Sequence, residues 1–222
     1  MGTATLQHET DRTLRGRMTL LAVVLIAVSL TVAANLLMRP LSPLDFEEFT
    51  SFQQMRDAVW LFGLIGSLGS VLAYTAFALA VCVLAPGKGS LFATVGTVIT
   101  GLGALCFGMG FFAVTNVGWY ATGPRTGVSG EAVFAYFMES PERVLAVQIS
   151  GFLAAAVGVV LLCIALLRAR SVPVAVAGAP AVLLIVSFLV DPQFINDIIT
   201  ALFMVSLAVV GGFLLRTARS RA

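Results

Sequence analysis

"LFATVGTVITGLGALCFGMGFFAVTNVGW", residues 91–119, contains no Asp, Glu, Lys or Arg. A helix needs about 20 apolar residues to cross the ~30 Å hydrocarbon core of a bilayer, so this stretch is long enough to cross. It is also rich in glycine: Gly96, Gly101, Gly103, Gly108 and Gly110. Small residues let membrane helices approach each other closely. The stretch therefore predicts a transmembrane helix that packs tightly against its neighbours.

The composition of the whole chain extends this prediction to the protein. Of its 222 residues, 59% are hydrophobic and only 11% are charged, and the mean hydropathy is +1.01. Soluble domains carry about 25% charged residues, so this chain cannot cover itself with polar surface. The frequent use of Arg, Ala, Val, Leu and Gly is typical of a GC-rich bacterium. We predict a multi-pass protein of the plasma (inner) membrane whose main partner is the lipid bilayer.

Six apolar runs meet the length criterion: 18–38, 58–85, 91–119, 144–167, 172–190 and 192–215. The first run is longer than the apolar region of a cleaved signal peptide, so we interpret it as a retained helix. The fifth is the shortest and has Pro180 at its centre, which predicts a kink. The expected fold is all-α, a bundle of six transmembrane helices in one domain over 18–215. Cytoplasmic tails at 1–17 and 216–222 complete it.

The basic residues predict the orientation, because short cytoplasmic loops carry an excess of Lys and Arg. With both termini inside, the inner segments hold Arg12, Arg15, Arg17, Lys88, Arg168, Arg170, Arg216, Arg219 and Arg221. The outer segments hold Arg39, Arg56, Arg125 and Arg143. We therefore expect an N-in, C-in topology. Basic residues confined to the membrane surface give no indication of nucleic-acid binding.

The outer loop 39–57, RPLSPLDFEEFTSFQQMRD, is predicted to contain an amphipathic helix. Ser42-Pro43 is typical of a helix start. Apolar residues then recur near the helical period: Phe46, Phe49, Phe52 and Met55. Such a helix can anchor the loop to lipid or fold over the mouth of the bundle as a lid, and both alternatives stay open.

The outer loop 120–143 has a glycine-rich first half and an aromatic second half, EAVFAYFMESPER. The second half places Phe134, Tyr136, Phe137 and Met138 between Glu131 and Glu139. This predicts a second amphipathic segment. Ser140-Pro141 repeats the cap-and-proline pattern and should open the fourth spanning helix.

Several kinds of chemistry find no support in the residues. Cys82, Cys106 and Cys163 lie in apolar runs without a CxxC pair, which argues against disulfides or a thiolate metal site. The single histidine, His8, lies in the N-terminal tail, so an intramembrane metal site or a Ser-His-Asp relay is excluded. PGKGS at 86–90 lacks the first glycine of a phosphate-binding loop. We expect no metal and no cofactor.

Polar side chains recur at a similar depth in five of the predicted spans. They are Asn35, Asp57, Asn116, Gln148 and Asp197. Such groups are costly in lipid and usually face the bundle interior or a wet cavity. A shared pocket open to the outer side explains them, with aromatic walls from Trp60, Phe111, Phe112 and Trp119. The alternative is that each side chain is simply hydrated in the headgroup region.

The two aspartates of DPQFIND, residues 191–197, have different predicted roles. Asp191 precedes Pro192 and is predicted to be the N-cap of the last helix, where a carboxylate suits the helix dipole. Asp197 lies beyond the capping positions and enters the apolar zone. It is the first candidate for a functional carboxylate, and Asp57 is the second.

In size, polytopic form and sparse acidic residues, the chain resembles the small integral-membrane terpene cyclases of bacterial and fungal secondary metabolism. The resemblance is architectural, without a diagnostic motif, and the fungal proteins have seven helices. It implies an isomerase or lyase acting on a lipophilic isoprenoid. Asp197 and Asp57 would protonate the substrate, Asn116 and Gln148 would orient them, and aromatic faces would stabilise a cation.

Two other classes of function remain open. A small proton-coupled carrier would use Asp57 or Asp197 to bind the coupling ion. However, such carriers usually place their sites at the bilayer midplane, and no carboxylate lies there. A non-catalytic accessory protein would need no pocket. The identity of the substrate and the oligomeric state are also open.

Overall fold

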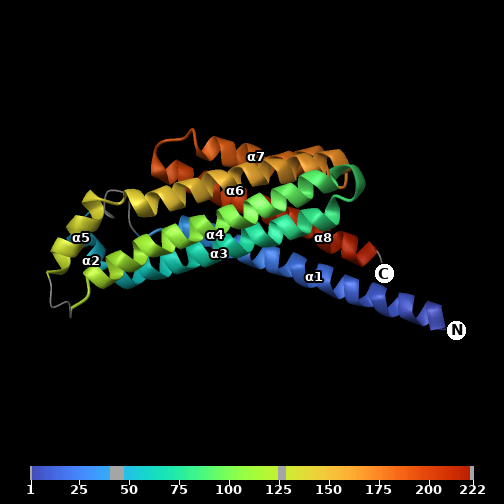
Figure 1. The fold of residues 1–222 in the computed structure, drawn as a ribbon, viewed down its shortest axis with the longest axis horizontal. Helices are drawn as coiled ribbons and strands as arrows, with labels where there is room; N and C mark the ends of the chain where they lie inside the picture. Colours follow the sequence, from blue (N-terminus) through green and yellow to red (C-terminus); the bar gives the residue numbers. More distant parts are fainter. Residues whose placement is uncertain (1, 41–47, 125–128, 221–222) are drawn as a thin grey trace.

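The structure is a computed structural model that describes residues 2–40, 48–124 and 129–220, with side chains from Thr13 onward. Within these residues it is all-helical, which confirms the predicted fold class (Figure 1). The helices are α1 (Gly2–Leu37), α2 (Phe49–Gln54), α3 (Arg56–Leu84), α4 (Ser90–Ala121), α5 (Gly130–Glu139), α6 (Glu142–Ala169), α7 (Val174–Ser187) and α8 (Gln193–Ser220). A short 3-10 turn, η2 (Gly87–Gly89), joins α3 to α4.

Five of the described helices, α1, α3, α4, α6 and α8, are long and apolar enough to cross a membrane. The predicted sixth span, 172–190, is different. It yields α7, which has only 14 residues and therefore rises about 21 Å, less than the ~30 Å of a bilayer core. The helix starts only after Pro173 and gives way at Phe188 to a turn that leads into α8. Apolar composition alone predicted a longer helix than the two boundaries permit.

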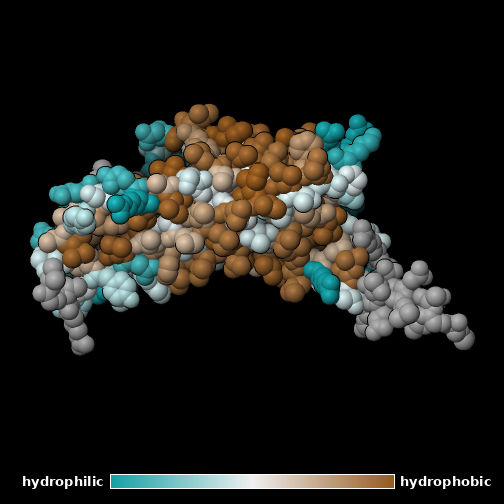
Figure 2. All heavy atoms as spheres, viewed as in Figure 1, coloured by the Kyte–Doolittle hydropathy of each residue, from teal (hydrophilic) through white to brown (hydrophobic). Residues whose placement is uncertain are grey.

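The bundle has two distinct ends, which we call the terminal end and the loop end. Both chain termini and η2 lie at the terminal end, whereas α2 and α5 lie at the loop end (Figure 1). The start of α1 and the end of α8 thus lie at the same end of the bundle. On the face that Figure 2 shows, the side chains between the ends form a broad, mostly hydrophobic surface, with hydrophilic residues toward the two ends. Lipid contact along this middle zone follows from its composition.

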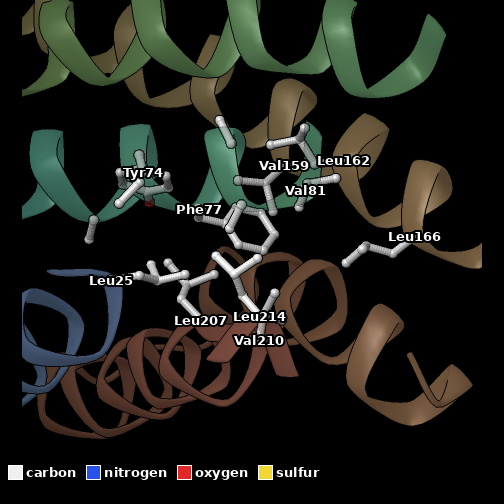
Figure 3. Packing of buried hydrophobic residues seen from close by; sticks show 14 of the residues in the cluster. Leu25, Tyr74, Phe77, Val81, Val159, Leu162, Leu166, Leu207, Val210 and Leu214 are labelled. Atoms are coloured by element: carbon white, nitrogen blue, oxygen red, sulfur yellow. The ribbon is translucent and has the colours of Figure 1, made fainter. Parts of the chain in front are cut away.

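The half of the bundle near the terminal end is packed shut. Figure 3 shows Phe77 and Val81 of α3 meeting side chains of α6 and α8. Fully buried residues in this cluster are Leu25, Phe77, Val81, Val159, Leu162, Leu166, Leu207, Val210 and Leu214. These aliphatic and aromatic side chains pack against one another, so this half forms a closely packed base of the bundle.

Helices α4 and α6 approach each other to backbone contact. A Cβ atom added at Gly103 would clash with the backbone of Ala155 and would lie 2.7 Å from the carbonyl oxygen of Gly151. A Cβ at Gly158 would lie 2.6 Å from the backbone nitrogen of Thr100. The predicted role of the glycines in close packing is therefore confirmed at this interface. Gly101 is an exception, because a Cβ there would meet nothing within 4 Å.

The two loop helices pack against each other and against the bundle. Phe134 of α5 lies edge-on to Phe49 and Phe52 of α2, with ring centroids 5.7 and 5.6 Å apart. Phe52 is buried and its ring covers Gly118 of α4. The buried aromatic side chains thus face protein rather than lipid. The predicted cap at Ser42-Pro43 and the apolar residue Phe46 lie outside the described residues.

Two helix starts differ by one residue from their predictions. Helix α6 begins at Glu142, with Pro141 rather than Ser140 at the N-cap. Helix α8 begins at Gln193, and the carbonyl of Pro192 accepts from the backbone N–H groups of Ile195 and Asn196. Pro192 therefore occupies the cap position that was predicted for Asp191. The proline ring, with its fixed φ, is accommodated just outside the first turn instead of inside it.

The glycine contact predicts a sharp difference between two substitutions in the same helix. Gly103→Ala should lower the free energy of unfolding by about 1–3 kcal/mol, because backbone atoms of α6 would have to move. Gly101→Ala adds the same methyl group where space is open and should leave stability unchanged or slightly raised. Thermal unfolding of both variants in one detergent measures the difference. Equal melting temperatures would contradict the contact.

Candidate functional site

A cavity of about 350 Å³ opens in the half of the bundle near the loop end. Its walls come from α3, α4, α6, α7 and α8 and from the end of α1. Polar side chains at the rim are Arg39, Gln148, Ser187, Gln193, Asn196 and Asp197. The floor is reached at Ser70, Tyr74 and Met204, which lie further along α3 and α8 toward the terminal end. We call this the central cavity.

An ion pair joins the end of α1 to α8 at the rim of the central cavity. Nη1 of Arg39 lies 3.4 Å from both carboxylate oxygens of Asp197. Gln193, one turn earlier on α8, donates from Nε2 to Oδ1 of Asp197 at 2.8 Å. The side chains of Arg39 and Asp197 are only 20% and 12% exposed. The carboxylate therefore accepts hydrogen bonds from two side chains in a mostly water-free setting.

The surroundings of Asp197 bear directly on its predicted role as a proton donor. An ionised carboxylate only accepts hydrogen bonds, whereas a carboxylic acid must donate one. Both neighbours of Asp197 present N–H donors to it. The geometry is that of an anion held by a guanidinium and an amide. Asp197 is thus placed to hold a positive charge or to accept a proton.

Four phenylalanines form one wall of the central cavity. Phe107 stacks on Phe111 at 5.9 Å and contacts Phe152 at 5.5 Å between centroids. Phe62 meets Phe111 edge-on at 6.1 Å, and Cζ of Arg39 lies 5.8 Å from the centroid of Phe62. The wall therefore runs from the ion pair into the apolar interior. A ligand in contact with both would need one polar end and an apolar body.

Gln148 contributes an unpaired polar atom to the central cavity. Its Oε1 is buried and has no hydrogen-bond partner among the described residues. A Cβ atom at Gly110 would lie 2.6 Å from Cβ of Gln148, so the glycine lets α4 press against the base of this side chain. An unsatisfied buried acceptor costs about 1–3 kcal/mol. A donor from a ligand or a water molecule in the cavity would remove that cost.

Asn35 has a different position from the one predicted. Its side chain is buried and its Nδ2 donates to the carbonyl oxygen of Phe62 at 3.1 Å. It does not line the central cavity. The contact ties α1 to α3 directly behind the aromatic wall. Asn35 therefore positions a wall residue and is not itself placed to touch a ligand there.

The remaining predicted site residues gather elsewhere, on the outer surface of α3 and α4. Asp57, Trp60, Asn116 and Trp119 line a separate, open pocket of about 560 Å³. The single pocket predicted for all the polar residues is thus divided in two. Asp57 and Trp60 lie on a different face of α3 from Phe62 and Gly66, a rotation that depth along the helix does not reveal. Phe112 lines neither pocket and offers its carbonyl oxygen to Asn116 and Thr115.

Among the residues that line the central cavity, the sequence-based prediction named only Phe111, Gln148 and Asp197. It missed both hydrogen-bonding partners of Asp197. In the sequence analysis Arg39 is only one of the basic residues of the outer segments. Gln193 occurs there only within the DPQFIND stretch that begins the last helix. The signal that points to them is the scarcity of ionisable residues between Arg170 and Arg216. A buried Asp there needs a partner from another helix.

No protein-family model matches the chain, and no curated protein or solved structure is detectably similar to it. Among the residues that the structure describes, no three His, Cys, Asp or Glu side chains are grouped so that they could hold a metal ion. Over the part of the chain that the structure describes, the fold and the site define an all-helical protein with five helices able to cross a membrane and a polar-rimmed cavity between them.

The ion pair predicts a non-additive pattern of stability. Arg39→Met alone takes the guanidinium away from the buried carboxylate of Asp197 and should cost about 2 kcal/mol or more. Asp197→Leu alone takes this carboxylate away from Arg39 and should also lower the free energy of unfolding. The double variant removes both charges and should recover most of that loss. Thermal unfolding of the parent, both single variants and the double variant in detergent measures this coupling. Arg143→Met, at an exposed position, serves as the control, and purely additive losses would show that the pair is not coupled.

Proposed function

We propose that this protein binds a small, largely apolar molecule with one polar end in the central cavity. One observation supports the proposal above all: a single cavity combines the Arg39–Asp197 ion pair, the unpaired oxygen of Gln148 and a wall of four phenylalanines. Its volume, about 350 Å³, lies within the range of small-molecule sites. The polar end of the ligand would lie at the ion pair, and its apolar body would follow the phenyl rings.

The closed base of the bundle favours binding or catalysis over transport. Beyond Tyr74 and Met204, the inward-facing side chains of Phe77 on α3 and of Leu207 and Val210 on α8 are fully buried and apolar. The polar lining that starts at the rim therefore ends at the floor of the cavity, at Ser70 and Tyr74. A carrier would have to open this core to pass a substrate across the membrane. Ligand access from one side only is what an enzyme or a binding protein needs.

The aromatic wall also supports a terpene-cyclase-like reaction as the catalytic form of this proposal. Phenyl faces stabilise a carbocation as it moves through a hydrocarbon substrate. Asp197, held by the ion pair with Arg39 and the hydrogen bond from Gln193, lies at the polar end of this wall. Asp57 lies in the other pocket and takes no part.

Filling the central cavity tests the binding proposal. Farnesol, an isoprenoid alcohol, should raise the melting temperature of the parent in detergent, because ligand binding stabilises the folded state. Ser70→Leu extends a side chain into the floor of the cavity and should abolish this shift. Thr200→Leu, from α8, should do the same. Both variants are expected to unfold cooperatively without farnesol.

Ser150→Leu is the matched control, since it makes the same change on an exposed face of α6. It should retain the full farnesol shift. The same shift in all four proteins would mean that farnesol acts through the micelle and not through the cavity. That result would count against the proposal.

A further inference from the structure

The open pocket on α3 and α4 has the features of a second binding site. It is lined by Asp57, Trp60, Leu61, Asn116, Trp119 and Tyr120, none of which lines the central cavity. It lies in the first turns of α3 and the last turns of α4, at the loop end of the bundle. That level corresponds to the border of the apolar zone, where Trp and Tyr side chains meet lipid headgroups. We call it the interfacial pocket.

Hydrogen bonds hold the aromatic rings of the interfacial pocket in place. Nε1 of Trp119 donates to Oδ1 of Asp57 at 2.8 Å, and Nε1 of Trp60 donates to Oδ1 of Asn116 at 3.2 Å. Asn116 is itself anchored, because its Nδ2 donates to the carbonyl oxygen of Phe112 at 2.8 Å. Tyr120 packs edge-on against Trp119 at 5.1 Å. Three rings and one carboxylate are thereby set around one space before any ligand arrives.

The charges beside the interfacial pocket form a fixed pair of opposite sign. Asp57 lies in the first turn of α3, where the helix dipole favours a negative group. Its carboxylate can accept further hydrogen bonds besides the one from Trp119. The guanidinium of Arg56 stacks on Trp119 at 4.3 Å and donates to the carbonyl oxygen of that residue at 3.0 Å. A positive and a negative group are thus held next to each other by the same tryptophan.

A stripe of exposed leucines leads away from the interfacial pocket along α3. Leu61 lies in the pocket itself, and Leu68, Leu72 and Leu79 follow on the same face of the helix. The three that follow are between 46% and 57% exposed. These side chains offer an apolar track that starts at the pocket and runs toward the middle of the bundle. Acyl chains attached to a headgroup in the pocket would find this track directly below it.

We propose that the interfacial pocket binds the headgroup of a zwitterionic phospholipid. The alkylammonium group lies against Asp57 and the faces of Trp60 and Tyr120, since aromatic rings and a carboxylate both attract organic cations. The phosphate lies toward Arg56, and the acyl chains follow the leucine stripe. The site is independent of the central cavity and of the function proposed for it.

A comparison of the binding of two lipids tests this assignment. The purified protein in detergent is titrated with phosphatidylethanolamine and with phosphatidylglycerol of the same acyl chains, and binding is followed by the shift in melting temperature. Phosphatidylethanolamine should bind more tightly, because only its headgroup carries the ammonium. Asp57→Asn keeps an acceptor for Trp119 but removes the charge. It should weaken phosphatidylethanolamine binding about tenfold, the factor for one charge-assisted contact, and leave phosphatidylglycerol unchanged.

Further variants test whether the lipid preference belongs to the interfacial pocket. Asp191→Asn removes an exposed carboxylate elsewhere at the loop end and should keep the lipid preference. Trp60→Leu should reduce it. Without lipid, Asp57→Asn should unfold cooperatively at or slightly below the parent temperature, because it loses only a charge that the helix dipole favours. It should retain the farnesol shift, which belongs to the central cavity. Equal binding of the two lipids, or an unchanged preference in Asp57→Asn, would overturn the proposal.

A soluble analogue distinguishes a lipid from a water-soluble amine. Glycerophosphoethanolamine carries the same headgroup without acyl chains and should give no shift at concentrations where the lipid saturates. A comparable shift with the soluble compound would show that the leucine stripe contributes nothing. In that case the assignment to a membrane lipid would be wrong.

Discussion

Backbone contact between α4 and α6 is the constraint on which the rest of the structure depends. Lipid tails are as apolar as leucine, so membrane helices gain little from burying apolar surface and associate through close packing instead. Gly103, Gly151 and Gly158 provide that packing. The same contact shapes the central cavity, because Gly110 lets α4 press on Gln148 and Gly151 faces the backbone of Phe107. A larger residue at these positions would displace both the unpaired acceptor and the aromatic wall.

The helical class and the axial level of the polar residues could be predicted from the sequence, because both depend on position along the chain. Rotation about the helix axis could not be predicted from depth alone. Asp57 and Asp197 were therefore assigned to one pocket, although one lies on the outer surface and the other inside the bundle. The partner of Asp197 also escaped prediction, since Arg39 is distant in sequence and meets it only when α1 packs on α8. The short length of α7 could not be predicted either, because the residues of the turn that ends it are themselves apolar.

The Arg39–Asp197 pair shows how a membrane protein keeps charge in an apolar setting. Each charge alone would be costly at this depth, and together with Gln193 they satisfy part of each other's hydrogen-bonding needs. A buried ion pair is weak evidence for added stability, because a protein in which apolar residues replace both partners is often equally stable. Its position at the rim of a cavity is more informative. The pair supplies a dipole to an otherwise hydrocarbon-lined space, and such a dipole orients a ligand that has one polar end.

The shortness of α7 has a consequence for how a ligand reaches the cavity. The helix ends at Ser187, on the rim, and the next residues, Phe188 and Leu189, are 46% and 78% exposed and apolar. The rim therefore adjoins a surface that lipid covers, and a hydrophobic molecule dissolved in the leaflet can diffuse sideways to it. Partitioning concentrates such a molecule in the bilayer far above its aqueous level. For the ligand proposed above, occupancy of the site would be set by its mole fraction in the membrane, so a modest intrinsic affinity would be enough to fill the site.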